Sequence, residues 1–390
     1  MSERPLRVLS VAHTAVERAA GRLRYHPFAG RRDLDVHLVV PRRWHQFGRV
    51  IEADPAGDPG VAVHVLPIWF PRAGPMRWYL HVYPGLGGRI QQLRPDVIHL
   101  WEEPWSLVAL QAAVLRKDAA LVLEVDQNIL KRLPPPFEAI RRYVLGTTDH
   151  ILSRSPDATA VVRACGYAGP VTEIGYGVDR ATFAPMPRAA RPPGLRLGYV
   201  GRLVVEKGLD DALDALARVA PDVTLTIMGE GPHEQPLRER ARSLGLAERV
   251  SIRGWGRPDE VAGFIRGLDA LLLLTRTTPV VKEQFGRVII EAQSCGVPVI
   301  GSECGAIPAV TADGGWIVAE SDPTALAALI GTLRADPSLL ASASAAALRN
   351  VEAHFTYEAV AAQLADAWTA AARRRAVPGF TPVKSRAGSW

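Results

Sequence analysis

Several residue and segment types are scarce in this chain, and each scarcity excludes a class of protein. The 390 residues include three cysteines, too few for a disulfide framework and without the spacing of metal ligands. Such sparse cysteines fit a reducing compartment. No apolar run approaches the roughly 18 residues needed to cross a bilayer, and no charged-then-apolar leader opens the sequence. We therefore expect a cytoplasmic protein, at most peripheral at the inner face of a membrane.

Lysine is also scarce, because only five of the 46 Lys and Arg residues are lysines. Arginine is thus the default cation. The net charge of +6 is compatible with acidic ligands, anionic lipid or nucleic acid. The arginines are scattered and no nucleic-acid-binding motif appears, so we expect no nucleic-acid partner. A chain of this length, 48% hydrophobic and 22% charged, suits two domains that each have a core.

Short apolar segments alternate with helical ones throughout the chain. The predicted strands are 6–12, 36–40, 61–65, 97–100, 121–125, 150–153 and 171–174, then 195–200, 224–228, 250–252, 270–274 and 299–301. Helices are predicted over Thr14 to Gly30 and around Tyr79 to Leu93. This alternation predicts parallel sheets covered by helices on both faces, with ligands at the carboxyl ends of the strands.

The stretch 282–300 reads as a loop, a short helix and a buried strand. The helix opens near Gly286, where free backbone N–H groups and the helix dipole favour a phosphate. Glu283 precedes this seat and Glu291 lies more than a turn inside the helix. Like charges repel, so these carboxylates suit hydroxyl-rich neighbours: a sugar on one side and a ribose on the other. Solvated surface glutamates are the competing interpretation.

A second loop of this kind follows the strand at 195–200. After Gly201, Arg202 offers a planar fork for phosphate oxygens and Lys207 a mobile point charge. A solvent-facing turn is the simpler interpretation of one such pair. Two loops of this kind in one Rossmann-like half favour a ligand site.

These segments together resemble the retaining glycosyltransferases of family 4, which have the GT-B fold. The resemblance rests on Gly201-Arg202…Glu206-Lys207-Gly208 and Glu283…Phe285-Gly286…Glu291, with the turn 228–232 and the stretch 175–179 in support. It covers nearly the whole chain. It implies an α/β protein of two Rossmann-like domains facing each other across a cleft, and sugar transfer from a nucleotide sugar, most simply a UDP- or GDP-sugar, to a hydroxyl acceptor with retained anomeric configuration.

The resemblance also implies roles for individual residues. Arg202, Lys207 and Glu283 would act at the reacting centre. The donor would be held by Gly201, Phe285, Gly286, Arg287 and Glu291, with the base near Arg253 and Gly254. No cofactor and no metal are expected, because two cations already neutralise the diphosphate.

Residues after the early strands are candidates for the acceptor side. His13 stands where many relatives have a glycine-rich loop, which this chain lacks. Glu102 and Glu103 either recognise hydroxyl groups, with Trp101 or Trp105 stacking on a sugar, or simply open a helix. Many relatives carry a histidine near the strand end at 125. Here Asp126 and Asn128 stand there, and we expect polar contacts from them at the reacting centre.

Composition divides the chain. We expect an acceptor-side domain over 1–187, a nucleotide-sugar domain over 188–355 after a proline-rich linker, a final helix 356–375 packing back on the first domain, and a disordered tail 376–390. The aromatic and basic segment 67–83 suits either a membrane interface or, as we favour, a loop packed on its own domain.

The expected partners are a nucleotide-sugar donor and a glycan, lipid-linked sugar or small-metabolite acceptor. Three other functions stay open. One is a nucleotide-sugar epimerase or hydrolase on the same fold, and another is a non-catalytic descendant that only binds. The third is a nicotinamide dehydrogenase, against which the missing glycine fingerprint after the first strand weighs.

Overall fold

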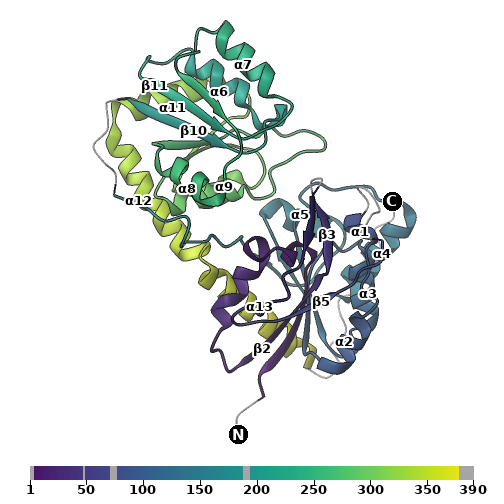
Figure 1. Ribbon diagram of the computed structural model, residues 1–390. Helices are drawn as coiled ribbons and strands as arrows, with labels where there is room; N and C mark the ends of the chain where they lie inside the picture. The colour runs from purple at the N-terminus through teal and green to yellow at the C-terminus, as the bar shows by residue number, and fades with distance from the viewer. Residues whose placement is uncertain (1–3, 47–48, 71–76, 188–193, 377–390) are drawn as a thin grey trace. The chain divides into compact units, whose positions relative to one another are not determined.

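The computed structural model describes residues 4–46, 49–70, 77–187 and 194–376 (Figure 1). The chain forms two compact units, Met1–Gly175 with Tyr357–Trp390, and Tyr176–Thr356. We had expected the boundary later, in the proline-rich segment. The expected tail lies, apart from Ala376, outside the described residues. Among the described helices, none is long and apolar enough to cross a membrane.

The first unit is built on a seven-stranded parallel sheet in the order β5-β2-β1-β6-β7-β8-β9. Its strands are β1 Leu6–Val11, β2 Leu34–Pro41, β5 Ala62–Leu66, β6 Val97–Trp101, β7 Ala120–Val125, β8 His150–Ser153 and β9 Val171–Glu173. Its helices are α1 Arg77–Leu80, α2 Leu86–Leu93, α3 Leu107–Leu115, α4 Pro135–Thr147, α5 Pro156–Ala164 and α13 Tyr357–Ala376. Every residue of β6 and β7 is buried, as expected for central strands covered on both faces.

The second unit repeats this plan with a six-stranded parallel sheet in the order β12-β11-β10-β13-β14-β15. Its strands are β10 Leu195–Val200, β11 Val223–Met228, β12 Val250–Arg253, β13 Ala270–Leu273, β14 Val299–Ser302 and β15 Gly315–Val318. Its helices are α6 Leu209–Leu216, α7 Glu234–Ser243, α8 Pro258–Arg266, α9 Arg287–Ser294, α10 Ile307–Thr311, α11 Pro323–Ala335 and α12 Pro337–His354. The two parallel-sheet α/β domains confirm the predicted fold class.

The strand order places the functional loops. In each sheet the order reverses at the first strand, between β1 and β6 and between β10 and β13. Loops that leave neighbouring strands in opposite directions open a crevice at such a point, where ligands of doubly wound sheets bind.

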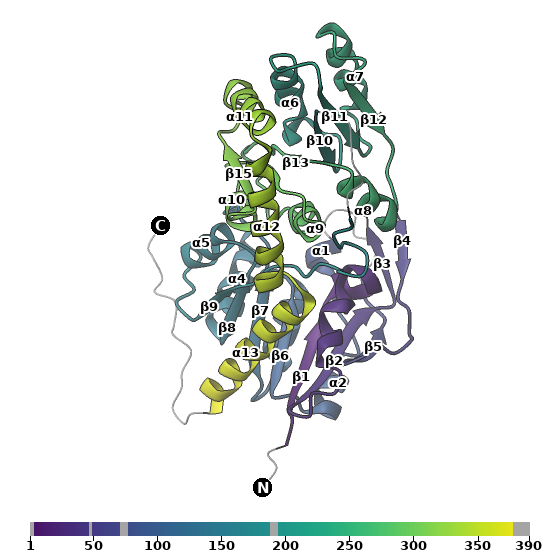
Figure 2. The same ribbon diagram turned by 90° about the vertical axis from the view of Figure 1, so that its left-hand side faces the viewer.

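The final helix, α13, belongs to the first unit. Figure 2 shows it lying along the strands of that sheet. Trp368 is fully buried, with its ring centroid 5.3 Å from that of Phe28 and 5.5 Å from that of His99. Arg374 donates to His150 at 2.8 Å. This helix therefore closes one face of the sheet.

Several predicted elements were wrong. The helix expected over Thr14 to Gly30 is three short irregular turns, His13–Val16, Arg18–Arg22 and Leu23–Phe28, because Arg22 is drawn inside to donate to three backbone carbonyl groups. The helix expected near 79–93 is split into α1 and α2 around Pro84, which cannot continue a hydrogen-bonded turn. Strand β15 and a small antiparallel pair, β3 Arg43–Gln46 with β4 Arg49–Glu52, were not foreseen.

Candidate functional site

A charged cluster lies in the second unit where the loops after β10 and β13 leave the sheet. Lys207 ends a 3-10 turn, Val205–Lys207, and Glu283 lies in the loop before α9. Lys207 Nζ lies 2.6 Å from Glu283 Oε2 and 3.2 Å from the hydroxyl oxygen of Thr275. That hydroxyl also donates to Glu283 Oε2 at 2.9 Å. The predicted cation and acid therefore meet at the switch point of the sheet.

The loop that carries Glu283 is fixed by hydrogen bonds between the Glu283 backbone and both Cys304 and Ala306. The Glu283 N–H donates to the Cys304 sulfur at 3.4 Å, and the Glu283 carbonyl accepts from Ala306 N–H at 3.0 Å. Cys304 is buried and also accepts from the Thr277 hydroxyl. These contacts present the carboxylate on a rigid support.

Helix α9 begins at Gly286, which has a left-handed backbone with φ 77°. A Cβ atom there would lie 2.9 Å from the terminal side-chain carbons of both Ile289 and Leu273, so another residue would displace these side chains as well as strain the backbone. No side chain caps the first turn. Its first-turn backbone N–H groups therefore have no side-chain cap, as an anion seat would require.

Phe285 and Arg287, which we predict to bind the donor sugar nucleotide, lie on either side of Gly286 in different environments. Phe285 is 3% exposed and packs edge-on against Tyr176 and Phe355, so its ring supports the loop instead of facing a ligand. Arg287 is exposed, with its guanidinium 5.4 Å from the Tyr176 ring centre. The buried aromatic ring anchors the loop and leaves the cation at the surface.

Glu291 lies in the body of α9, four residues after Arg287. Burial raises the pKa of its carboxyl to about 7, and the Arg287 charge opposes that rise only in part. A carboxyl group in this state exchanges its proton near neutral pH, so its capacity to accept hydroxyl hydrogen bonds depends on pH.

The remaining predicted donor residues lie at the ends of neighbouring strands. Arg202 is exposed beyond β10, and its carbonyl accepts from the Tyr199 hydroxyl at 2.9 Å. Gly201 N–H donates to the carbonyl of Met228 at the end of β11. Arg253 and Gly254 are exposed at the end of β12.

In the first unit, the predicted acceptor-side residues His13 and Glu102 meet across the switch point of that sheet. His13 Nδ1 lies 2.5 Å from Glu102 Oε1, and His81 Nε2 lies 3.4 Å from the same oxygen. All three side chains are buried. Burial alone would raise the pKa of Glu102, but the two histidines hold it at about 2.

These three residues could offer ligand atoms to a metal ion, since the atoms lie within 4.8 Å of one another. The 2.5 Å contact, however, is a hydrogen bond with no room for an ion between its atoms. Trp44 packs on His13 with ring centroids 4.5 Å apart. The cluster therefore fits a hydrogen-bonded support at the strand ends.

Glu103 faces a different strand end. Its Oε1 accepts from the backbone N–H groups of Asp126 and Gln127 at 3.0 and 2.9 Å. Burial, and next the Asp126 charge, raise its pKa to about 8. Trp105 is 5% and Trp101 4% exposed, so neither ring presents the open face that sugar stacking requires.

Asp126, for which we predict polar contacts at the reacting centre, already has partners within its own unit. Its Oδ1 accepts from Arg154 Nε at 2.8 Å and its Oδ2 from Trp101 Nε1 at 3.1 Å. Asn128 is 5% exposed. The Asp126 carboxylate is thus held by Arg154 and Trp101, and its contact with a ligand stays a prediction.

Two sets of contacts were not predicted from the sequence: those of Thr275 in the second unit and the ion pairs of Glu124 in the first. Thr275 directly follows the apolar run 270–274, and a polar residue ending a buried strand was the available signal. In the first unit, the buried Glu124 pairs with Arg154 and with Arg24, the latter at 2.8 Å. No local pattern marks that pairing, because Arg24 and Glu124 are 100 residues apart.

Known proteins are similar to this chain in sequence and in fold. The profile of the family "Glycosyl transferases group 1" matches residues 189–349, and that of "Glycosyltransferase Family 4" matches residues 28–182. A D-inositol 3-phosphate glycosyltransferase of Stackebrandtia nassauensis is 30% identical over 330 residues, or 75% of this chain and 72% of the relative. A glycogen synthase of Mycobacterium tuberculosis is 28% identical over 329 residues, 78% of each chain.

Solved structures agree on the fold. A sucrose-phosphate synthase from Thermosynechococcus elongatus has a TM-score of 0.68 at 19% identity, covering 93% of this chain and 98% of its own. The Anabaena protein HepE in complex with UDP has a TM-score of 0.67 at 18% identity, covering 93% and 99%. With both domain profiles matched and the GT-B fold shared, the chain belongs to the group 1 glycosyltransferases of family 4.

Proposed function

We propose that this glycosyltransferase moves a sugar from a UDP- or GDP-sugar to a hydroxyl acceptor with retention of anomeric configuration and without a metal. The observation that carries the proposal is the Lys207–Glu283–Thr275 cluster beside the start of α9, at the switch point of the second sheet. It combines a cation, an acid and free backbone N–H groups at a position suited to a diphosphate and its sugar.

The chemistry requires stabilisation of the leaving group, since negative charge grows on the diphosphate as the glycosidic bond breaks. Lys207 has three ammonium donors, and Glu283 and Thr275 engage two. The third has no partner among the residues that the structure describes and would be available to a phosphate oxygen. Arg202 and the first-turn N–H groups after Gly286 would add to this stabilisation.

The acids would bind hydroxyl groups. Glu283 is held by its backbone and by Thr275, so its orientation persists when a sugar displaces part of the Lys207 contact. Glu291 would accept from the ribose, and Arg253 and Gly254 would flank the base. Retention would follow from attack by the acceptor on the face that the diphosphate leaves, aided by a donor phosphate oxygen, without a protein nucleophile.

The choice of donor class is supported by relatives. Structures of HepE have been solved with UDP and with UDP-glucose. A mannosyltransferase of Mycolicibacterium smegmatis, 34% identical over 189 residues, is named as GDP-mannose-dependent. The acceptor would be a glycan, a lipid-linked sugar or a small metabolite, met in the cytoplasm with at most weak peripheral membrane contact.

Product analysis tests this function. The protein would be incubated with UDP- and GDP-sugars and a mixed acceptor panel in EDTA, with release of the nucleoside diphosphate measured and the product's anomeric configuration read by NMR. We expect acceptor-dependent release and a product with the donor's configuration. An inverted product would contradict the retaining mechanism, and activity that EDTA abolishes would contradict metal independence.

A further inference from the structure

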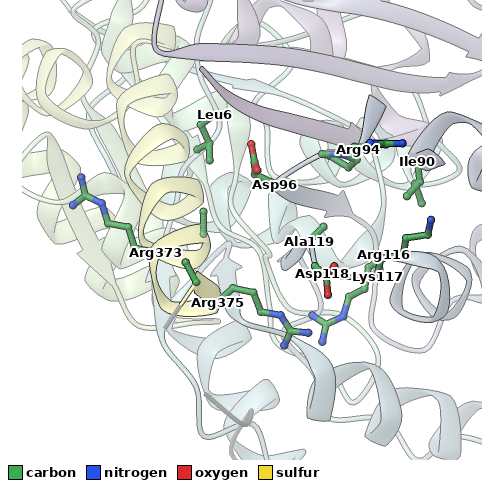
Figure 3. A pocket seen from close by; sticks show the side chains of 13 residues that line it. Leu6, Ile90, Arg94, Asp96, Arg116, Lys117, Asp118, Ala119, Arg373 and Arg375 are labelled. Carbon is green, nitrogen blue, oxygen red and sulfur yellow. The ribbon is translucent and has the colours of Figure 1, made fainter. Parts of the chain in front are cut away.

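A pocket of about 740 Å³ opens on the first unit, at the edge of the sheet opposite the acceptor-side residues (Figure 3). Its lining includes Leu6 at the start of β1, and Asp96 and Ala119 just before β6 and β7. His13, Glu102 and Asp126 instead follow the carboxyl ends of these strands. The five residues of β6 span about 16 Å, so the pocket is separate from the acceptor side.

The pocket wall is rich in cations. Its charged lining residues are Arg94, Arg116, Lys117, Arg373 and Arg375 against Asp96 and Asp118. Asp96 is already neutralised by Arg4, with two contacts of 2.6 and 2.8 Å. Arg373 extends away from the other labelled cations in Figure 3. The cations that remain still outnumber the free carboxylates.

Two guanidinium groups share one carboxylate at this pocket. Arg116, 7% exposed, donates to Asp149 Oδ2 at 2.8 Å, and Arg375 Nη1 lies 3.9 Å from Asp149 Oδ1. Figure 3 shows the two guanidinium groups close together. One carboxylate cannot neutralise two such groups. Positive charge and unused planar N–H donors therefore remain where a ligand would enter.

Arg94 and Lys117 add an independent observation. Both have left-handed backbones, with φ 47° and 52°, just after the ends of α2 and α3. Glycine is the usual residue with a left-handed backbone just after a helix. The helix dipole favours a cation near the C-terminus, but it does not require that the cation occupy the left-handed position. Neither side chain has a hydrogen bond or ion pair within the described part of the chain. Two cationic residues thus occupy strained positions and leave their charges unused.

We propose that this pocket binds a phosphate-bearing small molecule. The guanidinium fork matches phosphate oxygens in geometry, and Lys117 adds a mobile charge. The volume falls within the range of small-molecule sites, and the apolar side chains of Leu6 and Ile90 would contact the body of a ligand. Such a site would sense a phosphorylated metabolite away from the catalytic edge.

Inorganic pyrophosphate serves as the probe, titrated by calorimetry into the full chain. The first variant combines Arg94→Gly with Lys117→Gly, which removes both charges and relieves both strained backbones. Its melting temperature should not fall. In a Lys207→Ala background, which disables the proposed donor site, we expect this double change to weaken pyrophosphate binding at least about tenfold. Arg375→Ala should also weaken pyrophosphate binding, and it leaves the backbone at positions 94 and 117 unchanged. Arg142→Ala, an exposed arginine on α4, is the matched control and should bind normally.

Lys207→Ala separates this site from the donor site. Pyrophosphate binding that persists in Lys207→Ala, and is lost when both glycine substitutions are added to Lys207→Ala, supports the pocket. No saturable binding, or binding lost in Lys207→Ala but kept in the double glycine variant, would overturn it. Vesicles of phosphatidylglycerol distinguish the phosphate source. Binding without vesicle capture indicates a soluble ligand, whereas capture that pyrophosphate competes away, and that the double variant lacks, indicates a lipid headgroup.

Discussion

Lys207 is the residue on which the proposed chemistry depends most. Its ammonium contacts Glu283 and Thr275, and one donor without a partner in the described part of the chain would bind a phosphate in the proposed mechanism. We expect Lys207→Ala to reduce turnover about a hundredfold or more, because a charge-stabilising donor is lost where the leaving group forms. The free energy of unfolding should change by about 1 kcal/mol, since the ion pair is partly exposed. Steady-state rates and chemical denaturation measure both quantities.

Arg349→Ala is the matched control for this prediction. Arg349 is an exposed cation on α12 of the same unit, and it should leave both turnover and stability unchanged. Full activity in Lys207→Ala would remove the cluster from the mechanism.

The buried carboxyl of Glu291 predicts a dependence of stability on pH. Its pKa is about 7 in the folded state against an ordinary 4.5, so the folded state binds its proton more tightly than the unfolded state does. The free energy of unfolding of the native protein should therefore fall as pH rises from about 4.5 to about 7. Glu291→Gln has no such carboxyl group. Its free energy of unfolding should therefore rise by about 1–3 kcal/mol relative to that of the native protein between about pH 4.5 and about pH 7, and the difference should stay constant above about pH 7.

Denaturant titrations at several pH values measure the difference between the two proteins. Glu103, whose pKa is also raised by burial, is present in both and cancels. If the free energies of unfolding of the two proteins changed in parallel with pH, Glu291 would ionise at little cost in the folded state, and the prediction would be contradicted.

At the scale of the element, the start of α9 depends on Gly286. Gly286→Ala forces a Cβ against Ile289 and Leu273 and adds strain at φ 77°, so we expect a loss of about 1–3 kcal/mol and weaker donor binding. Gly331→Ala in α11 is the matched control. No atom lies within 4 Å of a Cβ there, and the change should stabilise the helix by about 0.5–1 kcal/mol. Thermal unfolding of Gly286→Ala and Gly331→Ala measures both effects. Similar shifts of the melting temperature in the two variants would contradict the steric explanation.

The alternation of strands and helices predicted the sheets, and the motifs singled out Lys207 and Glu283, since periodicity and glycine positions are local signals. The ion pair between these two side chains was not predicted, because it depends on two loops meeting in space. The irregular turns over 13–28 were not predictable, because the side chain of the buried Arg22 bonds to the carbonyl groups of Ala15, in the same segment, and of Asp54, 32 residues away. The pairing of Asp126 with Arg154 likewise depends on β7 and β8 being neighbours in the sheet.

For the whole molecule, two similar sheets use their switch points differently. In the second unit, that point carries the partly exposed cluster of Lys207 and Glu283. In the first, it carries the fully buried His13–Glu102 contact, backed by His81. We infer that the second unit provides the charge chemistry, while the first offers a rigid surface whose acceptor contacts lie outside this buried cluster.

A buried His13–Glu102 contact predicts a structural role. Glu102→Gln keeps the shape but removes the charge that both histidines approach, and should destabilise the fold by about 2–4 kcal/mol. Nucleotide binding should be unaffected, because the change lies in the other unit. Chemical denaturation and nucleotide titration together check this, and weakened nucleotide binding in a stably folded Glu102→Gln protein would contradict the assignment.

The most direct test of the central claim is calorimetric titration of UDP and GDP into the protein in EDTA, with Lys207→Ala and Arg349→Ala alongside. We predict saturable binding of one of these nucleotides at one site per chain, about tenfold or more weaker in Lys207→Ala and unchanged in Arg349→Ala. Nucleotide binding of equal strength in Lys207→Ala, or no binding of either nucleotide to the native protein, would contradict the donor site described for the second unit.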